Sequence, residues 1–268
     1  MPKLALIGAG RMASAIVDGL IAQKAYEPAE IGCFTASGNS AAALARRTGI
    51  HHCQTLEACL EGAVIVVIAF KPQHLVSADS RLATLTRDKL VLSVLAAKTL
   101  ARLRMVFPDA RAIVRSMPNT PAAIGAGITG WCSDVPLSEG DRNLLIGLLR
   151  AIGSEMEVPE PQIDALMAVS GCGPAFVFEF TAALREAGIA AGLPRDQAQR
   201  LAVETVLGSG RLMARTQAEP ESLRNQVTSP NGTTFAGLQV MAARDFRGTI
   251  LATVLAAKAR SEELSRDG

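Results

Sequence analysis

A glycine-rich turn near the N-terminus has the spacing of a site for the pyrophosphate of a dinucleotide. The turn follows an apolar run, residues 3–9, that predicts a strand, and it opens a segment with helical spacing. Gly8 permits the tight turn, Gly10 lets the backbone approach a phosphate, and Ala13 is small enough for the helix to pack closely on the strand. The free amides of that helix would face the anion. We therefore expect a nicotinamide dinucleotide to contact Gly8, Ala9, Gly10, Arg11 and Met12.

The residues that select the cofactor stand about 20 positions further on, at the end of the second strand. An Asp or Glu there would bind the ribose 2′-hydroxyl of NAD and repel a 2′-phosphate. Residues 33–40, Cys-Phe-Thr-Ala-Ser-Gly-Asn-Ser, contain no carboxylate. Arg46 and Arg47 follow one helix later, where they either add positive charge or belong to an exposed helical face. The sequence favours NADPH, with NADH as the alternative, and the expected phosphate donors are Thr35, Ser37, Asn39 and Ser40.

A second candidate contact follows the apolar run at residues 63–70, Ala-Val-Ile-Val-Val-Ile-Ala-Phe. Such a run is typical of a strand buried on both faces of a parallel sheet. Ligands bind outside the carboxyl ends of the strands in these sheets, so we expect Ala69, Lys71 and Pro72 at the cofactor. Lys71 would meet a phosphate or a ribose. Its alternative role is that of a solvated loop lysine.

The second half of the chain lacks the side chains that ketone reduction needs. His51, His52 and His74 all lie in the first half, and none of the six lysines lies between Lys98 and Lys258. A dehydrogenase that reduces a ketone usually needs a His or Lys to protonate the developing alkoxide. An iminium ion, C=N⁺, already carries its positive charge and leaves as a neutral amine. The residue inventory therefore favours reduction of an imine.

Two segments could hold the carboxylate and nitrogen of an imine acid. Residues 170–175, Ser-Gly-Cys-Gly-Pro-Ala, predict a glycine turn that runs into a helix. Residues 227–234, Val-Thr-Ser-Pro-Asn-Gly-Thr-Thr, predict a second turn, rich in hydroxyls. Successive backbone N–H groups before a helix make a carboxylate nest. The alternative for each segment is an ordinary capped helix start.

The elements that must position these residues fall into two halves. Strand and helix signals alternate in the first half, which predicts an α/β fold with a doubly wound parallel sheet of the Rossmann type. Further strands are expected at 30–36, 90–96 and 112–117, late edge strands at 127–132 and 155–158, and helices at 14–22 and 40–48. Strand signals nearly vanish after residue 160, and helices are expected at 174–191, 194–214, 233–243 and 246–264. Pro159 and Pro161 mark the change, so the expected domains are residues 1–159 and an all-α domain at 160–268.

Composition argues against several other classes of protein. The net charge of +2 and the absence of charged tails argue against a nucleic-acid partner. No apolar run approaches the roughly 20 residues of a membrane span, so no membrane association is expected. The five cysteines show no paired spacing of a zinc site or a disulfide framework, so we expect no metal and a cytoplasmic protein with reduced thiols. The wide apolar face of 246–264 packs either on a partner subunit or within the chain.

Five ordered motifs, spread over nearly the whole chain, resemble the pyrroline-5-carboxylate reductase family. They are the turn at 8–13, the pair Lys71-Pro72, Arg-Ser-Met-Pro-Asn-Thr-Pro at 115–121, the segment 170–175, and Thr-Ser-Pro-Asn-Gly-Thr-Thr at 228–234. The resemblance implies NADPH-dependent reduction of 1-pyrroline-5-carboxylate to L-proline, by hydride transfer to the C=N carbon. It also implies a helical domain that interlocks with a second subunit, and hence a homodimer, which in this family often assembles into decamers.

The resemblance further implies roles for single residues. Thr234 would be the catalytic residue, because its hydroxyl would lie nearest the ring nitrogen. Ala96 would lie beside the cofactor, and Asn119 would lie near the nicotinamide. The substrate-binding residues that it implies are Glu160, Ser229, Gly232, Thr233 and Thr234.

Three places depart from the pattern of the family. Cys172 replaces a serine of nearly equal size, and Asn231 replaces a glycine but tolerates the left-handed backbone that glycine favours. Leu95 and Ala97 stand where Ala and Gly are usual, and they would add bulk near the nicotinamide. Two alternatives stay open. One is reduction of another cyclic imine acid, such as a six-membered one, and the other is a dinucleotide-binding protein without turnover, against which the Thr-Thr pair argues.

Overall fold

The computed structural model describes residues 2–267, which form two compact units. The sheet unit comprises the chain up to Cys172 together with the chain from Ala257 onward, and the helical unit comprises Gly173–Ala256. This division by contacts differs from the boundary at 159–160, which stays a prediction about the functional domains.

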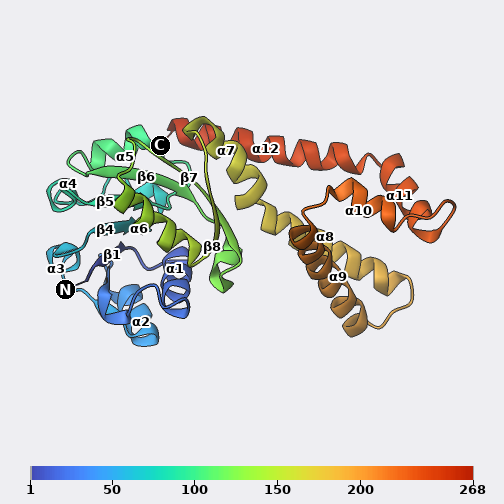
Figure 1. The fold of residues 1–268 in the computed structure, drawn as a ribbon, viewed down its shortest axis with the longest axis horizontal. Helices are drawn as coiled ribbons and strands as arrows, with labels where there is room; N and C mark the ends of the chain where they lie inside the picture. Colours follow the sequence, from blue (N-terminus) through green and yellow to red (C-terminus); the bar gives the residue numbers. More distant parts are fainter. Residues whose placement is uncertain (1, 268) are drawn as a thin grey trace. The chain divides into compact units, whose positions relative to one another are not determined.

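The sheet unit is built on an eight-stranded sheet with the strand order β3-β2-β1-β4-β5-β6-β7-β8 (Figure 1). The first six strands are all parallel to one another. Chain order reverses beside β1, because β1 lies between β2 and β4; this is the switch point at which Rossmann folds bind dinucleotides. The predicted parallel sheet is confirmed, and its first six strands are β1 Leu4–Ile7, β2 Ile31–Phe34, β3 His51–His52, β4 Ile65–Ile68, β5 Leu90–Ser93 and β6 Ala112–Met117.

Two strands complete the sheet at one edge. β7, Gly127–Ser133, runs antiparallel to β6, and β8, Gly153–Glu157, runs parallel to β7. The late strands were expected at the edge, and the structure confirms this position. The residues of β7 and β8 do not themselves indicate that these strands run opposite to the first six. That direction follows from the short connection between β6 and β7.

Helices cover both faces of this sheet, and alternate strand residues point into two separate cores. Leu4 and Leu6 of β1 pack in one core with α1 Arg11–Ala22, α2 Asn39–Thr48 and α6 Glu139–Arg150. Ala5 and Ile7 pack in the other core with α3 Leu56–Leu60, α4 Leu82–Leu85 and α5 Leu100–Val106. Burial on both faces explains why the central strands read as unbroken apolar runs.

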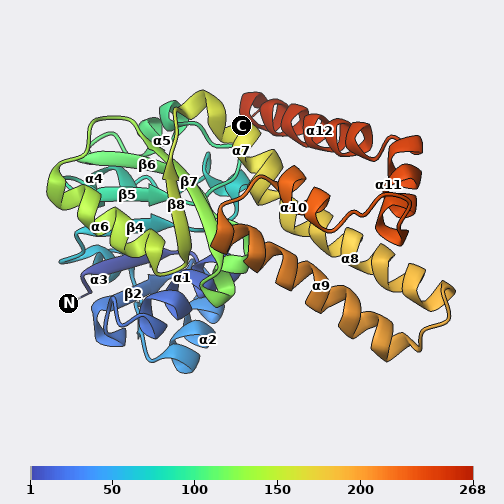
Figure 2. The same cartoon turned by 45° about the vertical axis from the view of Figure 1, so that its right-hand side comes forward.

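The helical unit contains no strand among its described residues (Figure 2). Its longest predicted helices are confirmed within a few residues, whereas α10 was not expected because Pro-Glu-Ser-Leu-Arg-Asn-Gln has no clear apolar period. Few of its side chains are buried: α8, α10 and α11 bury none, and α9 buries only Ala198 and Ala202. The helices are α8 Gly173–Ala190, α9 Arg195–Thr216, α10 Pro220–Gln226, α11 Thr233–Ala243 and α12 Phe246–Asp267.

The segment 170–175 is helical, so the predicted glycine turn is wrong there. α7, Ile163–Leu166, continues into a π-helical turn at Met167–Gly171 and then into α8. The amide of Cys172 donates to the carbonyl of Met167 at 2.9 Å, which leaves it unavailable for a carboxylate. The glycines predicted a break, but a wide π turn keeps the backbone bonded inside the helix.

The helical run Glu160–Ala190 is 31 residues long and apolar enough to cross a membrane by length and composition. The expectation that no segment approaches a span is therefore wrong for this helix. Sequence reading missed it because glycines and Glu179 interrupt the apolar run without making the segment polar. Its composition is equally that of a helix whose apolar side chains pack against another protein chain.

Candidate functional site

Gly8 is fixed in its turn by backbone on two sides. Its N–H donates to the carbonyl of Phe34 at 2.9 Å, and its φ of +118° lies in the region that side chains disfavour. A Cβ at Gly8 would lie 2.4 Å from the carbonyl carbon of Ala69. The turn after β1 is therefore clamped between the ends of β2 and β4, and only glycine fits.

Gly10 is not required by packing inside the chain. A Cβ at this residue would meet only the carbonyl oxygen of Ala69, at 4.0 Å. Gly10 is the N-cap of α1, no side chain caps that helix end, and its first turn has no acidic residue. The open space and the free amides fit a pyrophosphate that approaches the helix N-terminus.

A buried thiol is hydrogen-bonded to the same turn. Cys33 of β2 donates its Sγ–H to the carbonyl of Gly8 over 3.6 Å. Burial, and secondarily the neighbouring Cys53, raises the pKa of the Cys33 thiol to about 12. The thiol therefore stays protonated and keeps its hydrogen bond to the turn at neutral pH.

The turn after β2 has the chemistry of a phosphate site. Gly38 donates its amide to the carbonyl of Thr35 at 2.9 Å, and α2 begins with no side-chain cap and no acidic residue in its first turn. Ser40 Oγ lies 3.5 Å from Thr35 Oγ1. Arg47 points elsewhere, because its guanidinium is paired with Asp18 at 2.6 Å. The hydroxyls and amides of the turn, rather than Arg47, are thus the donors that a 2′-phosphate would meet.

A cavity of about 310 Å³ opens beside this turn, at the carboxyl ends of β1, β2 and β4. Phe34, Phe70 and Leu56 supply apolar walls, and Thr35 lies at the rim. The acidic residue in its lining, Asp79, is paired with Arg81 at 2.7 Å. An apolar pocket next to a phosphate-like turn suits the adenosine half of a dinucleotide.

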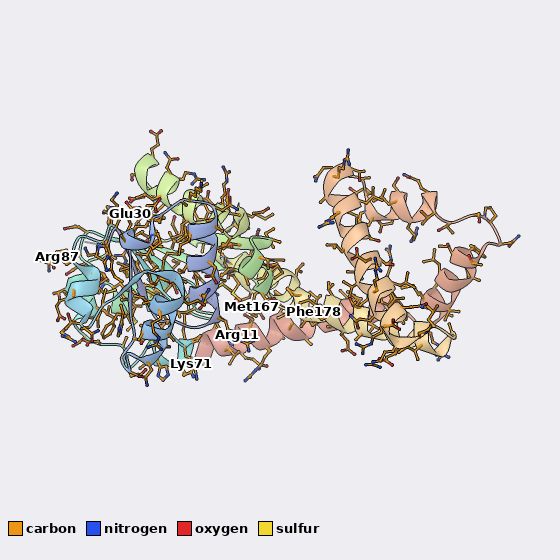
Figure 3. The ribbon with its side chains drawn as sticks, turned by 90° about the horizontal axis from the view of Figure 1, so that it is seen from below. Arg11, Glu30, Lys71, Arg87, Met167 and Phe178 are labelled. Atoms are coloured by element: carbon orange, nitrogen blue, oxygen red, sulfur yellow. The ribbon has the colours of Figure 1, made fainter. Side chains whose placement is uncertain are left out.

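Lys71 follows β4 at the same edge of the sheet as Arg11, which follows β1 (Figure 3). Its side chain is exposed, and its backbone carbonyl accepts from the amide of His74 at 2.9 Å in a short 3₁₀ turn that begins at Pro72. The structure therefore brings three segments together at the carboxyl ends of the strands: Gly8–Met12, Thr35–Asn39 and Ala69–Pro72. Their contacts with a cofactor stay a prediction.

The residues after β5 occupy unexpected positions. Leu95 is only 2% exposed and packs in the core with α3, α4 and α5, so its bulk lies in the core. Ala97 has a φ of +57°, in the left-handed region where glycine is favoured. Ala96 lies between them and is half-buried. Replacement of the family's usual glycine by Ala97 therefore strains the backbone more than it adds bulk.

Asn119 is a buried link between three segments. Its Oδ1 accepts from the amide of Ile128 in β7 at 3.0 Å, and its Nδ2 donates to the carbonyl of Ser170 at 3.1 Å. Both ends of the side-chain amide are thus used to hold the end of β6 against the π turn. Its predicted place near the nicotinamide stays untested.

Glu160 takes part in a network that sequence reasoning missed. Its Oε1 accepts from Arg115 at 3.1 Å and from the amide of Leu100 at 2.7 Å, which satisfies the start of α5. Arg115 is 3% exposed inside β6 and also reaches Asp164 at 3.4 Å. Asp164 in turn accepts from Ser261 Oγ at 2.6 Å. A charged residue inside the apolar run Ala-Ile-Val-Arg-Ser-Met was the available signal, because such a residue is rarely buried without a partner.

The second turn, in the helical unit, has the predicted form. Asn231 adopts the left-handed conformation with a φ of +59°, which confirms the expected tolerance for asparagine. A Cβ at Gly232 would lie 2.3 Å from Ser229 Oγ. Gly232 is the N-cap of α11, which no side chain caps, and Thr233 and Thr234 are exposed in its first turn. Thus the candidate substrate residues, except Glu160, belong to the helical unit, and the candidate cofactor residues belong to the sheet unit.

Comparisons with known proteins cover both units. Residues 160–264 match a family model described as pyrroline-5-carboxylate reductase dimerisation, and residues 3–97 match one described as NADP oxidoreductase, coenzyme F420-dependent. A pyrroline-5-carboxylate reductase of Synechocystis is 39% identical over 264 residues, which is 98% of each chain. This chain belongs to the pyrroline-5-carboxylate reductase family. The predicted family, enzyme class and fold are thereby confirmed.

Two solved structures of pyrroline-5-carboxylate reductases resemble this member of the family along 98% of both chains. The enzyme of Coxiella burnetii superimposes with a TM-score of 0.91 at 33% identity. The enzyme of Plasmodium falciparum, solved with NADP bound, superimposes with a TM-score of 0.87 at 26% identity. Together with the NADP oxidoreductase match, these findings confirm the predicted NADP class of cofactor. The dimerisation match also supports oligomerisation through the helical residues.

Proposed function

We propose that this chain reduces 1-pyrroline-5-carboxylate to L-proline with NADPH as the hydride donor. The observation that carries the proposal is the similarity of nearly the whole chain, in both units, to relatives named pyrroline-5-carboxylate reductase. The helical unit supports it independently, because it contains neither His nor Lys and its candidate site is a Thr-Thr helix start. An iminium substrate needs no such acid, since it accepts hydride and becomes a neutral amine.

The sheet unit would hold the cofactor, which supplies the hydride when bound. The amides of Arg11 and Met12 face the pyrophosphate at the start of α1. Thr35, Ser37 and Asn39 donate to the 2′-phosphate, and Lys71 adds a positive charge at the same edge. The remaining predicted contacts are Gly8, Ala9, Gly10, Ala69, Pro72, Ala96 and Asn119.

The helical unit would hold the substrate. The free amide of Thr233 at the start of α11 binds the carboxylate, as uncapped helix starts bind anions. Gly232 donates its own amide to the carbonyl of Ser229 at 3.0 Å, and its contact with the substrate remains a prediction. The Thr234 hydroxyl accepts a hydrogen bond from the iminium N–H of the ring and so keeps the C=N carbon in place. Ser229 shapes this turn. A substrate contact by Glu160 remains a prediction, and the carboxylate is already bonded to Arg115 and Leu100.

The proposal includes a homodimer formed through the helical unit, with a decamer as its higher assembly. Large apolar side chains of this unit are exposed in one chain, among them Phe178 at 64% and Leu251 at 60%. A second copy would cover them, which also accounts for the apolar helix at 160–190 without a membrane. We place the protein in the cytoplasm without a nucleic-acid partner, in keeping with its net charge of +2. Light scattering of the purified chain measures the assembly directly.

The test of function is NADPH oxidation with 1-pyrroline-5-carboxylate and with its six-membered analogue. We expect turnover to favour the five-membered ring, and product analysis to yield L-proline. If turnover favoured the six-membered ring, that imine acid would be the proposed substrate instead. Absence of turnover with both, while NADPH still binds, would leave a dinucleotide-binding protein without this activity.

Thr234→Ala tests the proposed catalytic hydroxyl. We expect kcat to fall about 100-fold, or roughly 2.7 kcal/mol, which is within the range of one hydrogen bond to a charged group. Thr228→Ala is the matched control, because that hydroxyl bonds to the carbonyl of Arg224 at 2.6 Å on the other side of the same turn. Equal effects of the two substitutions would reduce the role of Thr234 to that of a structural residue.

A further inference from the structure

A histidine from β3 faces the turn at which the cofactor is selected. A Cβ at Gly38 would lie 3.8 Å from Nε2 and 4.0 Å from the adjacent ring carbon of His52. Gly38 has a φ of +72° and is the N-cap of α2, a helix start that no side chain caps. The imidazole edge therefore borders the turn formed by Thr35–Gly38.

The strand register explains why His52 faces this way. His52 pairs with Cys33 of β2, and Cys33 packs in the core that contains α2. Neighbouring residues along a strand point to opposite faces. His51, which pairs with Gly32, therefore points to the face away from α2. Only the second of the two adjacent histidines is placed toward the turn.

The ring is oriented so that Nε2 is a donor. Gln54 Nε2 lies 3.3 Å from His52 Nδ1, and because a side-chain amide N–H can only donate, this hydrogen bond requires the neutral tautomer that carries its hydrogen on Nε2. His52 is half-buried, and its Nε2 has no bonded partner in the part of the chain that the structure describes. The arrangement is a preoriented N–H group directed at an uncapped helix start.

Nearby charges leave this N–H free for an anion. Acidic residues around the cavity are already paired: Asp79 and Glu57 with Arg81, and Asp18 with Arg47. The segment 33–40 contains no carboxylate. A phosphate at the turn would thus meet no unpaired carboxylate of these residues.

We propose that His52 is a further determinant of NADPH specificity, whose Nε2–H donates to the ribose 2′-phosphate. The inference rests on the proposed use of NADPH and adds a residue that the spacing after β2 could not indicate, since His52 follows that turn by more than ten positions. Gln54 acts through His52 as a positioning residue, because it fixes which ring nitrogen carries the hydrogen.

Binding of fragments tests this without any substrate. Calorimetry with adenosine 2′,5′-bisphosphate and with adenosine 5′-monophosphate compares ligands that differ by the 2′-phosphate. For His52→Ala we expect about tenfold weaker binding of the bisphosphate, the value of one hydrogen bond to a charged group, and a change within twofold for the monophosphate. The affinities for NADPH and NADH, measured by nicotinamide fluorescence, should change in the same way: that for NADPH should fall about tenfold, and that for NADH should change within twofold.

Two further variants sharpen the result. His51→Ala is the matched control on the opposite face of β3, and it should change none of the four affinities. His52→Gln keeps an amide donor of similar reach. Its affinity for the two ligands that carry the 2′-phosphate should fall only about threefold, which corresponds to a fraction of one hydrogen bond. Thermal unfolding monitored by Trp131 checks that the sheet unit is intact in each variant.

The outcomes separate this inference from the proposed function. Equal weakening of the ligands with and without the 2′-phosphate, or no weakening at all, would overturn the role of His52. A wild-type chain that binds NADH more tightly than NADPH would contradict the proposed cofactor instead. Failure to reduce 1-pyrroline-5-carboxylate would leave the binding result, and hence His52, unaffected.

Discussion

The sheet unit and the helical unit bury their apolar residues in different ways. Both faces of the sheet are covered by helices of the same chain, and strands such as β4 and β5 are fully buried. In the helical unit, Phe178, Val240 and Leu251 are each at least 60% exposed. A chain does not keep such a surface in water unless it is covered. We therefore expect the sheet unit to bind the cofactor within one chain, and the helical unit to need the proposed second copy.

Polar contacts follow the same division. Two buried charges of the sheet unit are paired: Arg115 with Glu160 and Asp164, and Asp141 with Arg111. The candidate substrate residues Thr233 and Thr234 are exposed at an uncapped helix start. Cofactor binding should accordingly survive changes that abolish assembly, and turnover should not.

The largest effect is expected from charges placed on the exposed face of the helical unit. The double substitution Phe178→Glu with Leu251→Glu should give monomers by light scattering, since burying two unpaired carboxylates costs several kcal/mol. We expect turnover to fall about 1000-fold, which corresponds to roughly 4 kcal/mol, while the dissociation constant of NADPH changes less than about twofold.

Met105→Glu is the control for that experiment, because Met105 is 72% exposed but lies on α5 of the sheet unit. It should leave both assembly and turnover unchanged. If the double variant remained a dimer with full activity, the dependence of the helical unit on a second copy would be refuted.

The next effect concerns the two glycines of the N-terminal turn, because a side chain would clash inside the chain at Gly8 but not at Gly10. Gly10→Val should weaken NADPH about 300-fold, or roughly 3.4 kcal/mol, because its side chain fills the space open to the pyrophosphate. Its melting temperature should stay close to that of the wild type. Gly8→Ala should instead destabilise the sheet unit, since its Cβ meets Ala69 at 2.4 Å. Tight NADPH binding by Gly10→Val would place the pyrophosphate elsewhere.

A somewhat smaller effect is expected from the buried arginine of β6. Arg115→Met leaves Glu160 and Asp164 without their cation, and removal of one partner of a buried pair typically costs about 3 kcal/mol or more. Urea unfolding followed by the fluorescence of Trp131, the sole tryptophan and fully buried in β7, reports on the sheet unit alone. A loss under about 1 kcal/mol would mean that water already solvates the two carboxylates.

Sequence reasoning succeeded where a local pattern has one physical meaning. The all-apolar run around Ile65–Ile68 is typical of a strand buried on both faces, and β4 is such a strand. The glycine turn at 8–13 and the helix start at 232–234 were located for the same reason. Asn231 was correctly expected to adopt a left-handed backbone.

The rest depends on contacts between distant residues, which no local pattern encodes. The partners of Arg115 come from positions 45 and 49 residues away. The glycines at 171 and 173 predict a break, yet a π turn carries the helix through them. Leu95 was expected beside the cofactor, but its side chain packs in the core. The orientation of His52 follows from strand register and from Gln54, and neither is visible in the sequence.

The smallest effect lies within the sheet unit and depends on pH. Asp141 is buried at the start of α6, where it accepts from Arg111 Nε at 3.0 Å and from Ser138 Oγ at 2.9 Å. The hydrogen bonds from Arg111 lower the pKa of this carboxyl below its usual value of 3.8. A lowered folded-state pKa stabilises the protein above the unfolded value, and this stabilisation is lost as the pH falls through the folded-state pKa.

Asp141→Asn should therefore lower the free energy of unfolding by about 1 kcal/mol at pH 7, and the difference from wild type should shrink below about pH 4. Asp109→Asn is the matched control, because its pair with Arg87 is exposed and should contribute less than about 0.5 kcal/mol at any pH. Urea unfolding by Trp131 fluorescence at pH 7, 5 and 3.5 measures both variants. A difference that stays constant down to pH 3.5 would show that the capping geometry of Asp141, rather than its charge, stabilises α6.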